Sequence, residues 1–241
     1  MKQPSSMNAE SRDPSMKLLS LNVGLPREVS WSGQKVRTGI FKEPVAGAVM
    51  LRRLNLDGDR QADLSVHGGP SKAAYVYPAE HYGYWRAQLP ERELPFGMFG
   101  ENFTTEGLDE ETVCIGDCFR VGNAQVVVTE PRMPCYKLGI RFGRMDMLKR
   151  FLKSQRTGFY FGVLDEGAVE AGDEMALVSR DATGLKVADV TRLYTTERGN
   201  AALLARAISV EALPERWRGY FQHLLEKLEH EGDRATRMNE G

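Results

Sequence analysis

Residues 125–138 read Gln-Val-Val-Val-Thr-Glu-Pro-Arg-Met-Pro-Cys-Tyr-Lys-Leu, and they combine a strand signal with a reactive side chain. The three consecutive valines are β-branched, which favours a strand over residues 125–129. Two prolines then rigidify the approach to Cys135, because each fixes φ and removes a backbone donor. We therefore expect a strand that leads into a rigid segment presenting a cysteine.

The surroundings of Cys135 are strongly basic. Eight basic and two acidic side chains between Val128 and Tyr160 give this window a charge of +6, whereas the whole chain carries −1. A thiol beside fixed positive charge is more readily present as thiolate, the form that attacks electrophiles and binds metals. Arg132 and Lys137 flank the cysteine, so we interpret it as a reactive thiol.

The composition of the 241-residue chain limits the class of protein. Hydrophobic residues make up 41% and charged residues 27%, as in an ordinary soluble globular protein. No apolar run approaches the ~20 residues that cross a bilayer, and a net charge near zero gives no general argument for nucleic acid. Three cysteines leave a remainder in any set of disulfides, which favours a reducing cytoplasm.

Short strand-like runs separated by turn residues dominate most of the chain. Their uneven spacing favours a closed or folded-over β barrel over a parallel sheet. We expect a disordered leader over residues 1–15, a β-barrel domain over 16–180 and a three-helix domain over 184–230. The predicted strands are residues 17–23, 35–41, 45–51, 73–77, 102–105, 125–129, 158–164 and 174–179.

Helical patterns interrupt and follow the strands. Pro78 and Pro214 each suit the first turn of a helix. Apolar residues at helical spacing after Pro214 predict burial against a partner surface. The predicted helices are residues 78–88, 144–153, 187–194, 201–208 and 214–228.

Two further segments carry candidate ligands. Gly68 and Gly69 let the backbone approach an anion closely, and His67 and Lys72 add side-chain donors beside them. Glu101-Asn102 follows a glycine at the start of a predicted strand, where both side chains can face a cavity. Taken alone, each segment is more often a polar turn than a site.

Cys135 alone admits other chemistries. A zinc site would use all three cysteines with a histidine, but the close-paired spacings of such sites are absent. A hydrolase would use Cys135 as nucleophile and His67 or His81 as base. Asn102 would then orient that base, although no protease-type signature surrounds the cysteine. Both stay open as weaker interpretations.

Taken together and in order, these segments resemble the MOSC-domain family, named after the C-terminal domain of molybdenum cofactor sulfurase, and most closely its YiiM type. The resemblance runs from about residue 16 to 228 and includes the helices after Ser179. Each motif is weak singly, but the ordered set is specific. The motifs are Leu56–Asp59, Val66–Pro70, Tyr77–Tyr82, Phe99–Asn102, Gly116–Asp117, Pro131–Lys137 and Thr157–Tyr160.

The resemblance implies a fold, a cofactor and a reaction. The fold is a mainly β, MOSC-type barrel with a C-terminal three-helix appendage, and its pocket holds the molybdenum cofactor (Mo-molybdopterin). Relatives of this type reduce N-hydroxylated compounds such as hydroxylaminopurines, amidoximes and hydroxylamines, a detoxification that draws electrons from an external flavin-containing reductase. We therefore expect a cytoplasmic oxidoreductase, monomeric or homodimeric, that binds neither nucleic acid nor membrane. The alternative is a non-catalytic carrier of sulfur or cofactor that uses a persulfide on Cys135.

Candidate site residues follow from the resemblance and from chemistry. The family cysteine that ligates molybdenum corresponds to Cys135, and a thiolate is a soft ligand suited to that metal. Cationic side chains suit the phosphate and dithiolene of the cofactor. Cys135, His67 and Glu101 are the expected catalytic residues, with His67 or Glu101 as proton donor. The expected cofactor-binding residues are Cys135, Arg132, Lys137, His67, Gly68, Gly69, Lys72, Asn102, Arg156 and Tyr160.

Overall fold

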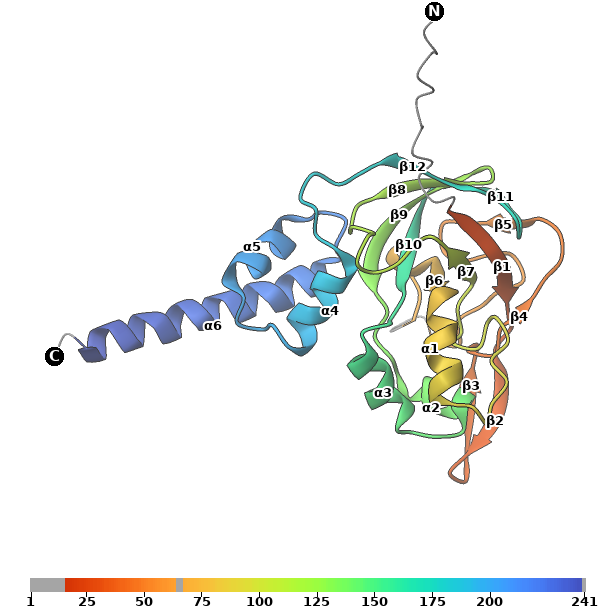
Figure 1. The fold of residues 1–241 in the computed structure, drawn as a ribbon, viewed down its shortest axis with the longest axis horizontal. Helices are drawn as coiled ribbons and strands as arrows, with labels where there is room; N and C mark the ends of the chain where they lie inside the picture. Colours follow the sequence, from red (N-terminus) through yellow and green to blue (C-terminus); the bar gives the residue numbers. More distant parts are fainter. Residues whose placement is uncertain (1–15, 64–66, 240–241) are drawn as a thin grey trace, which may run out of the picture.

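The computed structural model describes residues 16–63 and 67–239, with side chains up to residue 232, so the predicted leader lies outside the described residues. A mixed eight-stranded sheet forms its centre (Figure 1). Neighbouring strands are antiparallel, except for one parallel pair, β6 and β7. The strand order is β12 (Met175–Ser179), β8 (Cys118–Val121), β9 (Ala124–Pro131), β10 (Phe159–Asp165), β6 (Ala74–Pro78), β7 (Phe103–Glu106), β1 (Lys17–Val23) and β4 (Glu43–Pro44).

The sheet is not closed into the predicted barrel within the described residues. One long edge of β1 pairs with β7, and its other edge is divided between two partners. At the start of β1, the Leu18 amide donates to the Asp173 carbonyl (2.9 Å) and the Met175 amide donates to the Met16 carbonyl (2.8 Å). At its end, Val23 pairs with Glu43 of β4. The ladder between β1 and β12 therefore stops after a short contact, and a mixed open sheet results.

Two small sheets, three α-helices and the short 3-10 helix η1 (Pro70–Lys72) complete the β-rich part. The small sheets are β5 (Val49–Leu51) with β11 (Gly167–Val169) and the hairpin of β2 (Arg27–Trp31) with β3 (Gln34–Thr38). The helices α1 (Glu80–Gln88), α2 (Tyr136–Phe142) and α3 (Met147–Ser154) gather near that hairpin in Figure 1. We predicted α1 and α3, but not α2, which is only seven residues long and contains a glycine.

The last three helices are α4 (Val187–Thr195), α5 (Ala201–Ser209) and α6 (Glu215–Asn239), which confirms the predicted helical end of the chain. Trp217 and Phe221 of α6 are buried in the same apolar cluster as Val126 and Val128 of β9. The apolar stripe of α6 therefore packs on its own chain, whereas the helix itself runs beyond its predicted end. In Figure 1 the far half of α6 extends away from the sheet. The boundaries between the predicted domains stay predictions.

A second apolar cluster, rich in aromatic side chains, lies between α1, α3 and β6. The rings of Tyr77 and Phe99 stack with centroids 4.4 Å apart, and Phe151 and Trp85 stack at 6.1 Å. Each fully buried side chain of this size stabilises the fold by roughly 1.5–3 kcal/mol. The cluster therefore forms a rigid part of the core. No helix of the described residues is long and apolar enough to cross a membrane.

Candidate functional site

Cys135 stands at the junction of β9 and α2. Its backbone is extended (φ −114°, ψ 170°), and Tyr136 begins the helix directly after it. Pro131 ends β9, where it still pairs with Phe159 of β10. The strand, the prolines and the presented cysteine thus follow the predicted order.

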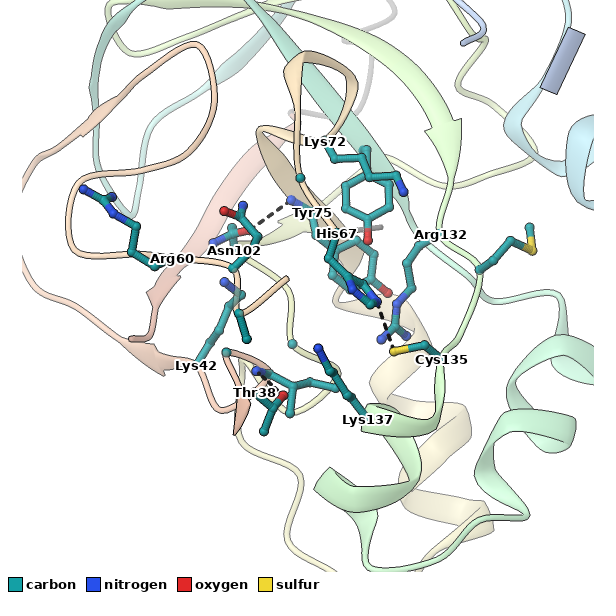
Figure 2. Close-up of a pocket in the computed structure, with 18 residues that line it drawn as sticks. Thr38, Lys42, Arg60, His67, Lys72, Tyr75, Asn102, Arg132, Cys135 and Lys137 are labelled. Atoms are coloured by element: carbon teal, nitrogen blue, oxygen red, sulfur yellow. Dashed lines mark hydrogen bonds between the residues drawn. The ribbon is translucent and has the colours of Figure 1, made fainter. Parts of the chain in front are cut away.

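Cys135 lines a pocket that holds about 670 Å³ of space not occupied by protein atoms, counted out to its open mouth. Figure 2 shows the side chains that surround it, which come from segments far apart in the sequence. His67, Lys72, Arg132 and Lys137 lie toward the Cys135 end in this view, and Arg60 toward the other. The lining residues are Thr38, Gly39, Ile40, Lys42, Arg60, Gln61, Ala62, His67, Gly68, Lys72, Tyr75, Gly100, Asn102, Arg132, Met133, Cys135, Lys137 and Tyr160.

The charge of the lining is positive. It contains five Lys or Arg side chains, and among the described residues it contains no Asp or Glu. One of the five, Lys42, is offset by the buried carboxylate of Asp59, with 2.5 Å between Nζ and Oδ1. Low-dielectric walls lined by one sign of charge concentrate the opposite sign. The pocket is therefore built to receive an anion.

His67 contacts the thiol. Its Nε2 lies 3.3 Å from Sγ of Cys135 (Figure 2). Burial first, and then the nearby positive charges of Lys137, Lys72 and Arg132, lower the pKa of His67 to about 4. The imidazole is therefore neutral at pH 7, so that Nε2 either accepts a hydrogen bond from the thiol or donates one to a thiolate. Its other nitrogen, Nδ1, is buried without a hydrogen-bond partner among the described residues.

Arg132 is the most deeply placed cation of this end of the pocket, with a fractional exposure of 6%. Its guanidinium lies over the rings of Tyr75 and Phe151, 5.0 Å from each centroid. Nη1 is buried and has no hydrogen-bond partner in the part of the chain that the structure describes. A buried donor left in this way costs about 1–3 kcal/mol. An anion in the pocket would supply the missing acceptor.

Lys72, Tyr160 and Gly68 complete this end of the pocket. Lys72 Nζ lies 5.7 Å from the centroid of the Tyr160 ring. Burial raises the pKa of Tyr160 to about 12, against the opposing effect of Arg132, so its hydroxyl is a donor at neutral pH. Gly68 and Gly69 have φ values of 134° and 91°, which L side chains rarely adopt. The paired glycines therefore shape the turn that carries Lys72.

Two predicted cofactor-binding residues lie outside the pocket, and a third lines it but serves the fold. Arg156 lies outside the lining, with its guanidinium 4.2 Å from the centroid of the Tyr84 ring. Gly69 also lies outside it, next to the lining residue Gly68. Asn102 lines the pocket, but its amide group serves the fold: Nδ2 donates to Asp59 (3.0 Å), and Oδ1 accepts from the Tyr75 amide (3.1 Å).

Glu101 is buried in the wall behind the pocket and is not part of the lining. Its carboxylate accepts hydrogen bonds from the amides of Gly97 (2.7 Å) and Phe99 (3.0 Å) and from the hydroxyl of Tyr82. Burial raises the pKa of this carboxyl group. The geometry gives Glu101 a role in fixing the loop at residues 97–100, not in contacting a ligand.

The weaker interpretations lose support. No group of three or more His, Cys, Asp or Glu within the described residues has the arrangement of a metal site, so zinc is not supported. Cys118 instead lies 3.5 Å from the Gly116 carbonyl oxygen, to which its thiol donates. His81, one of the two predicted bases, lies outside the pocket and forms a 2.6 Å contact with Glu110.

The opposite wall was missed by the sequence analysis. Lys42 and Arg60 lie more than 70 residues before Cys135 in the chain and reach the pocket through the topology of the sheet. The only sequence signal near them was the turn at Leu56–Asp59, whose last residue binds Lys42. A buried acid directly after the glycine of a turn is a weak indicator of a site.

The chain matches two family models. Residues 63–176 match the MOSC domain, and residues 187–228 match the YiiM-like, 3-alpha helix domain. The protein named YflK of Bacillus subtilis (strain 168) is 46% identical over 211 residues, which cover 88% of this chain and 95% of that protein. Protein YiiM of Escherichia coli (strain K12) is 42% identical over 156 residues, covering 64% and 67% of the two chains.

A solved structure and a more distant relative add to these matches. The crystal structure of YiiM from Geobacillus stearothermophilus superposes with a TM-score of 0.74 at 37% identity, over 87% of this chain and 99% of that one. A protein named Reductase from Gibberella moniliformis (strain M3125 / FGSC 7600) is 34% identical over 191 residues. These residues cover 78% of this chain but 34% of that protein.

Proposed function

Because this chain belongs to the MOSC family and carries the YiiM-like three-helix domain, we propose that it is a molybdenum-cofactor-dependent reductase of N-hydroxylated compounds. The observation that carries the proposal is the pocket itself. It joins one thiol, on Cys135, to a lining of cations that holds no carboxylate among the described residues. The similarity to a fungal protein named Reductase agrees with an oxidoreductase.

The residues present fit the proposed cofactor. Cys135 supplies a soft thiolate ligand for molybdenum. The buried Nη1 of Arg132, which has no hydrogen-bond partner in the described part of the chain, suits an oxyanion of the phosphate or an anionic dithiolene. Lys137 and Lys72 would hold the remaining negative charge, and the backbone at Gly68 allows close approach. When bound, the cofactor supplies the two-electron chemistry that converts N–OH to N–H with release of water.

The side chains of the pocket would then orient the substrate and manage protons. His67 is neutral at pH 7, and its Nε2–H can donate a hydrogen bond to the thiolate that Cys135 would present as a ligand. The Tyr160 hydroxyl, which stays protonated at neutral pH, is then a donor toward the departing oxygen. The electrons would come from an external flavin-containing reductase, a partner that stays a prediction.

Metal analysis of three proteins tests the proposal. Wild type, Cys135→Ser and the matched control Cys118→Ser, whose thiol lies outside the pocket, are produced in a host that synthesises the cofactor. We expect molybdenum in wild type and in the control, none in Cys135→Ser, and reduction of a hydroxylaminopurine by wild type with a chemical reductant. Wild type free of molybdenum would refute the proposal. Molybdenum without turnover would favour the carrier alternative, in which Cys135 holds a persulfide or passes the cofactor on.

A further inference from the structure

Glu130 is a buried carboxylate directly behind the pocket, with a side-chain exposure of 1%. Ser71 Oγ donates to its Oε1 (3.2 Å), and Trp217 Nε1 donates to its Oε2 (2.9 Å). Arg216 forms an ion pair with the same Oε2. Trp217 and Arg216 belong to the first turn of α6, so two residues of the C-terminal helices hold an acid of the central sheet.

A β-bulge explains how Glu130 reaches these partners. Tyr160 pairs with Glu130 and Phe161 pairs with Val128, which leaves Thr129 as the extra residue of β9. A bulge of this kind re-aims the side chains beside it. Thr129 Oγ1 accordingly donates to the Ser71 carbonyl (2.6 Å). Two consecutive residues of β9, Thr129 and Glu130, therefore both hydrogen-bond to Ser71 in the turn at residues 70–72.

The position of Glu130 links α6 to the Cys135 end of the pocket in two ways. Along the chain Glu130 precedes Arg132 by two residues and Cys135 by five. Through Ser71 it holds the residue next to Lys72, whose side chain lines the pocket. Burial lowers the pKa of Lys72, Glu130 raises it and Arg216 lowers it again, so the two α6-linked charges act on Lys72 in opposite directions.

We propose that Arg216 and Trp217 are positioning residues of the pocket: they hold the Glu130 carboxylate in place under the Ser71 turn and offset its charge, so that Lys72 faces an anion in the pocket. The C-terminal helices are then part of the working site. This role rests on the proposed function, because the anion that Lys72 would bind is the cofactor. The contacts of Glu130 with Arg216 and Trp217 are the same whichever anion binds.

Acylation of the Lys72 amine in the whole chain tests the charge relation. The rate is read by mass spectrometry of the peptide that contains Lys72. Arg216→Met leaves Glu130 without its cation, so the Lys72 ammonium should hold its proton more firmly and react about three- to tenfold more slowly at pH 8. Arg216→Lys should restore the wild-type rate. Arg206→Met removes the same charge from the exposed face of α5 and should leave the rate unchanged.

A double-mutant cycle separates this mechanism from a general loss of structure. In a Glu130→Gln background the Arg216 side chain, which is 56% exposed, loses the carboxylate that holds it near Lys72, so Arg216→Met should change the Lys72 rate less than twofold. An equal slowing in both backgrounds would show that Arg216 acts on Lys72 without its ion pair to Glu130, and it would overturn the proposed role of that pair. Unchanged labelling in Arg216→Met would overturn it as well, and Arg216 is exposed enough for the variant to fold, with 56% of its side chain accessible.

Hydrogen exchange tests the positioning by Trp217. The Lys72 amide donates to the Gly69 carbonyl (2.9 Å) and the Ala73 amide to the Phe161 carbonyl (3.0 Å). Trp217→Phe keeps the apolar ring but removes the donor to Glu130, so both amides should exchange about threefold or more faster while β9 stays protected. Unchanged exchange at residues 72 and 73 would refute the role of Trp217. These readouts need no cofactor, so they remain decisive even if wild type proves to contain no molybdenum.

Discussion

Replacing Arg132 with Met separates what the pocket needs for stability from what it needs for binding. The methionine keeps much of the buried stem volume between Tyr75 and Phe151 but removes the guanidinium. Two cation–π contacts are lost, each worth about 0.5–2 kcal/mol. Against this, the variant no longer buries an Nη1 donor that lacks a partner, which costs about 1–3 kcal/mol. The opposing effects nearly cancel, so we expect the free energy of unfolding to change by no more than ~1 kcal/mol.

Binding should respond far more strongly than stability. A hydrogen bond from a charged donor to an anion contributes about 1.5–3 kcal/mol, which is roughly a ten- to 150-fold change in affinity. We expect Arg132→Met to weaken binding of inorganic pyrophosphate by this factor in isothermal titration calorimetry, and to lower molybdenum content when protein is produced in a cofactor-synthesising host. Urea unfolding of the same samples gives the stability.

Arg156→Met is the matched control for this experiment. Both arginines are predicted cofactor contacts in the sequence analysis, but Arg156 lies outside the pocket and packs on Tyr84. Its replacement should leave pyrophosphate affinity within twofold of wild type. Equal weakening in the two variants, or unchanged affinity in Arg132→Met, would refute the assignment of Arg132 as the buried anion contact.

Three other variants test the support of the pocket. The native pKa of His67, about 4, lies below its unfolded value, so folding stability should fall as pH drops from about 6.5 to 4; His67→Gln should fall less over this range, as read from urea midpoints. Phe151→Ala should cost about 3–5 kcal/mol of unfolding free energy in urea melts, because the ring is fully buried. Gly158→Ala, whose new methyl would lie 2.2 Å from the Val76 carbonyl oxygen, should lower the melting temperature far more than Gly172→Ala, where φ is also positive but the space around the glycine is open.

Local patterns in the sequence were enough to predict the parts of the site that are close together in the chain. Three β-branched valines, two prolines and a cysteine occupy β9 and the segment after it as expected, because strand preference and proline geometry act over a few residues. The helices after Ser179 were predictable for a similar reason, since an apolar stripe at helical spacing must be buried somewhere. Neither inference needs knowledge of distant contacts.

The rest depended on pairing between distant segments. Whether the sheet closes is decided at the second edge of β1, which residues 172–175 and β4 share, and no local pattern encodes that division. The same limit explains Glu101. A carboxylate after a glycine has the same sequence signature whether it faces the pocket or turns inward to bind the amides of Gly97 and Phe99. Only the fold distinguishes the two.

The arrangement of acids behind the lining explains how so many cations can share one pocket before a ligand arrives. Asp59 lies behind Lys42, and Glu130 lies behind the turn that carries Lys72. Acids placed there reduce repulsion between the cations without occupying the cavity, where they would repel an anion. Near Cys135 the described part of the lining holds no acid; burial first, and then the positive charges of Lys137, Lys72 and Arg132, lower the pKa of His67 to about 4 and keep the imidazole neutral beside the thiol. The cations that attract an anionic cofactor thus also keep His67 uncharged, so that its Nε2–H can donate to the Cys135 thiolate.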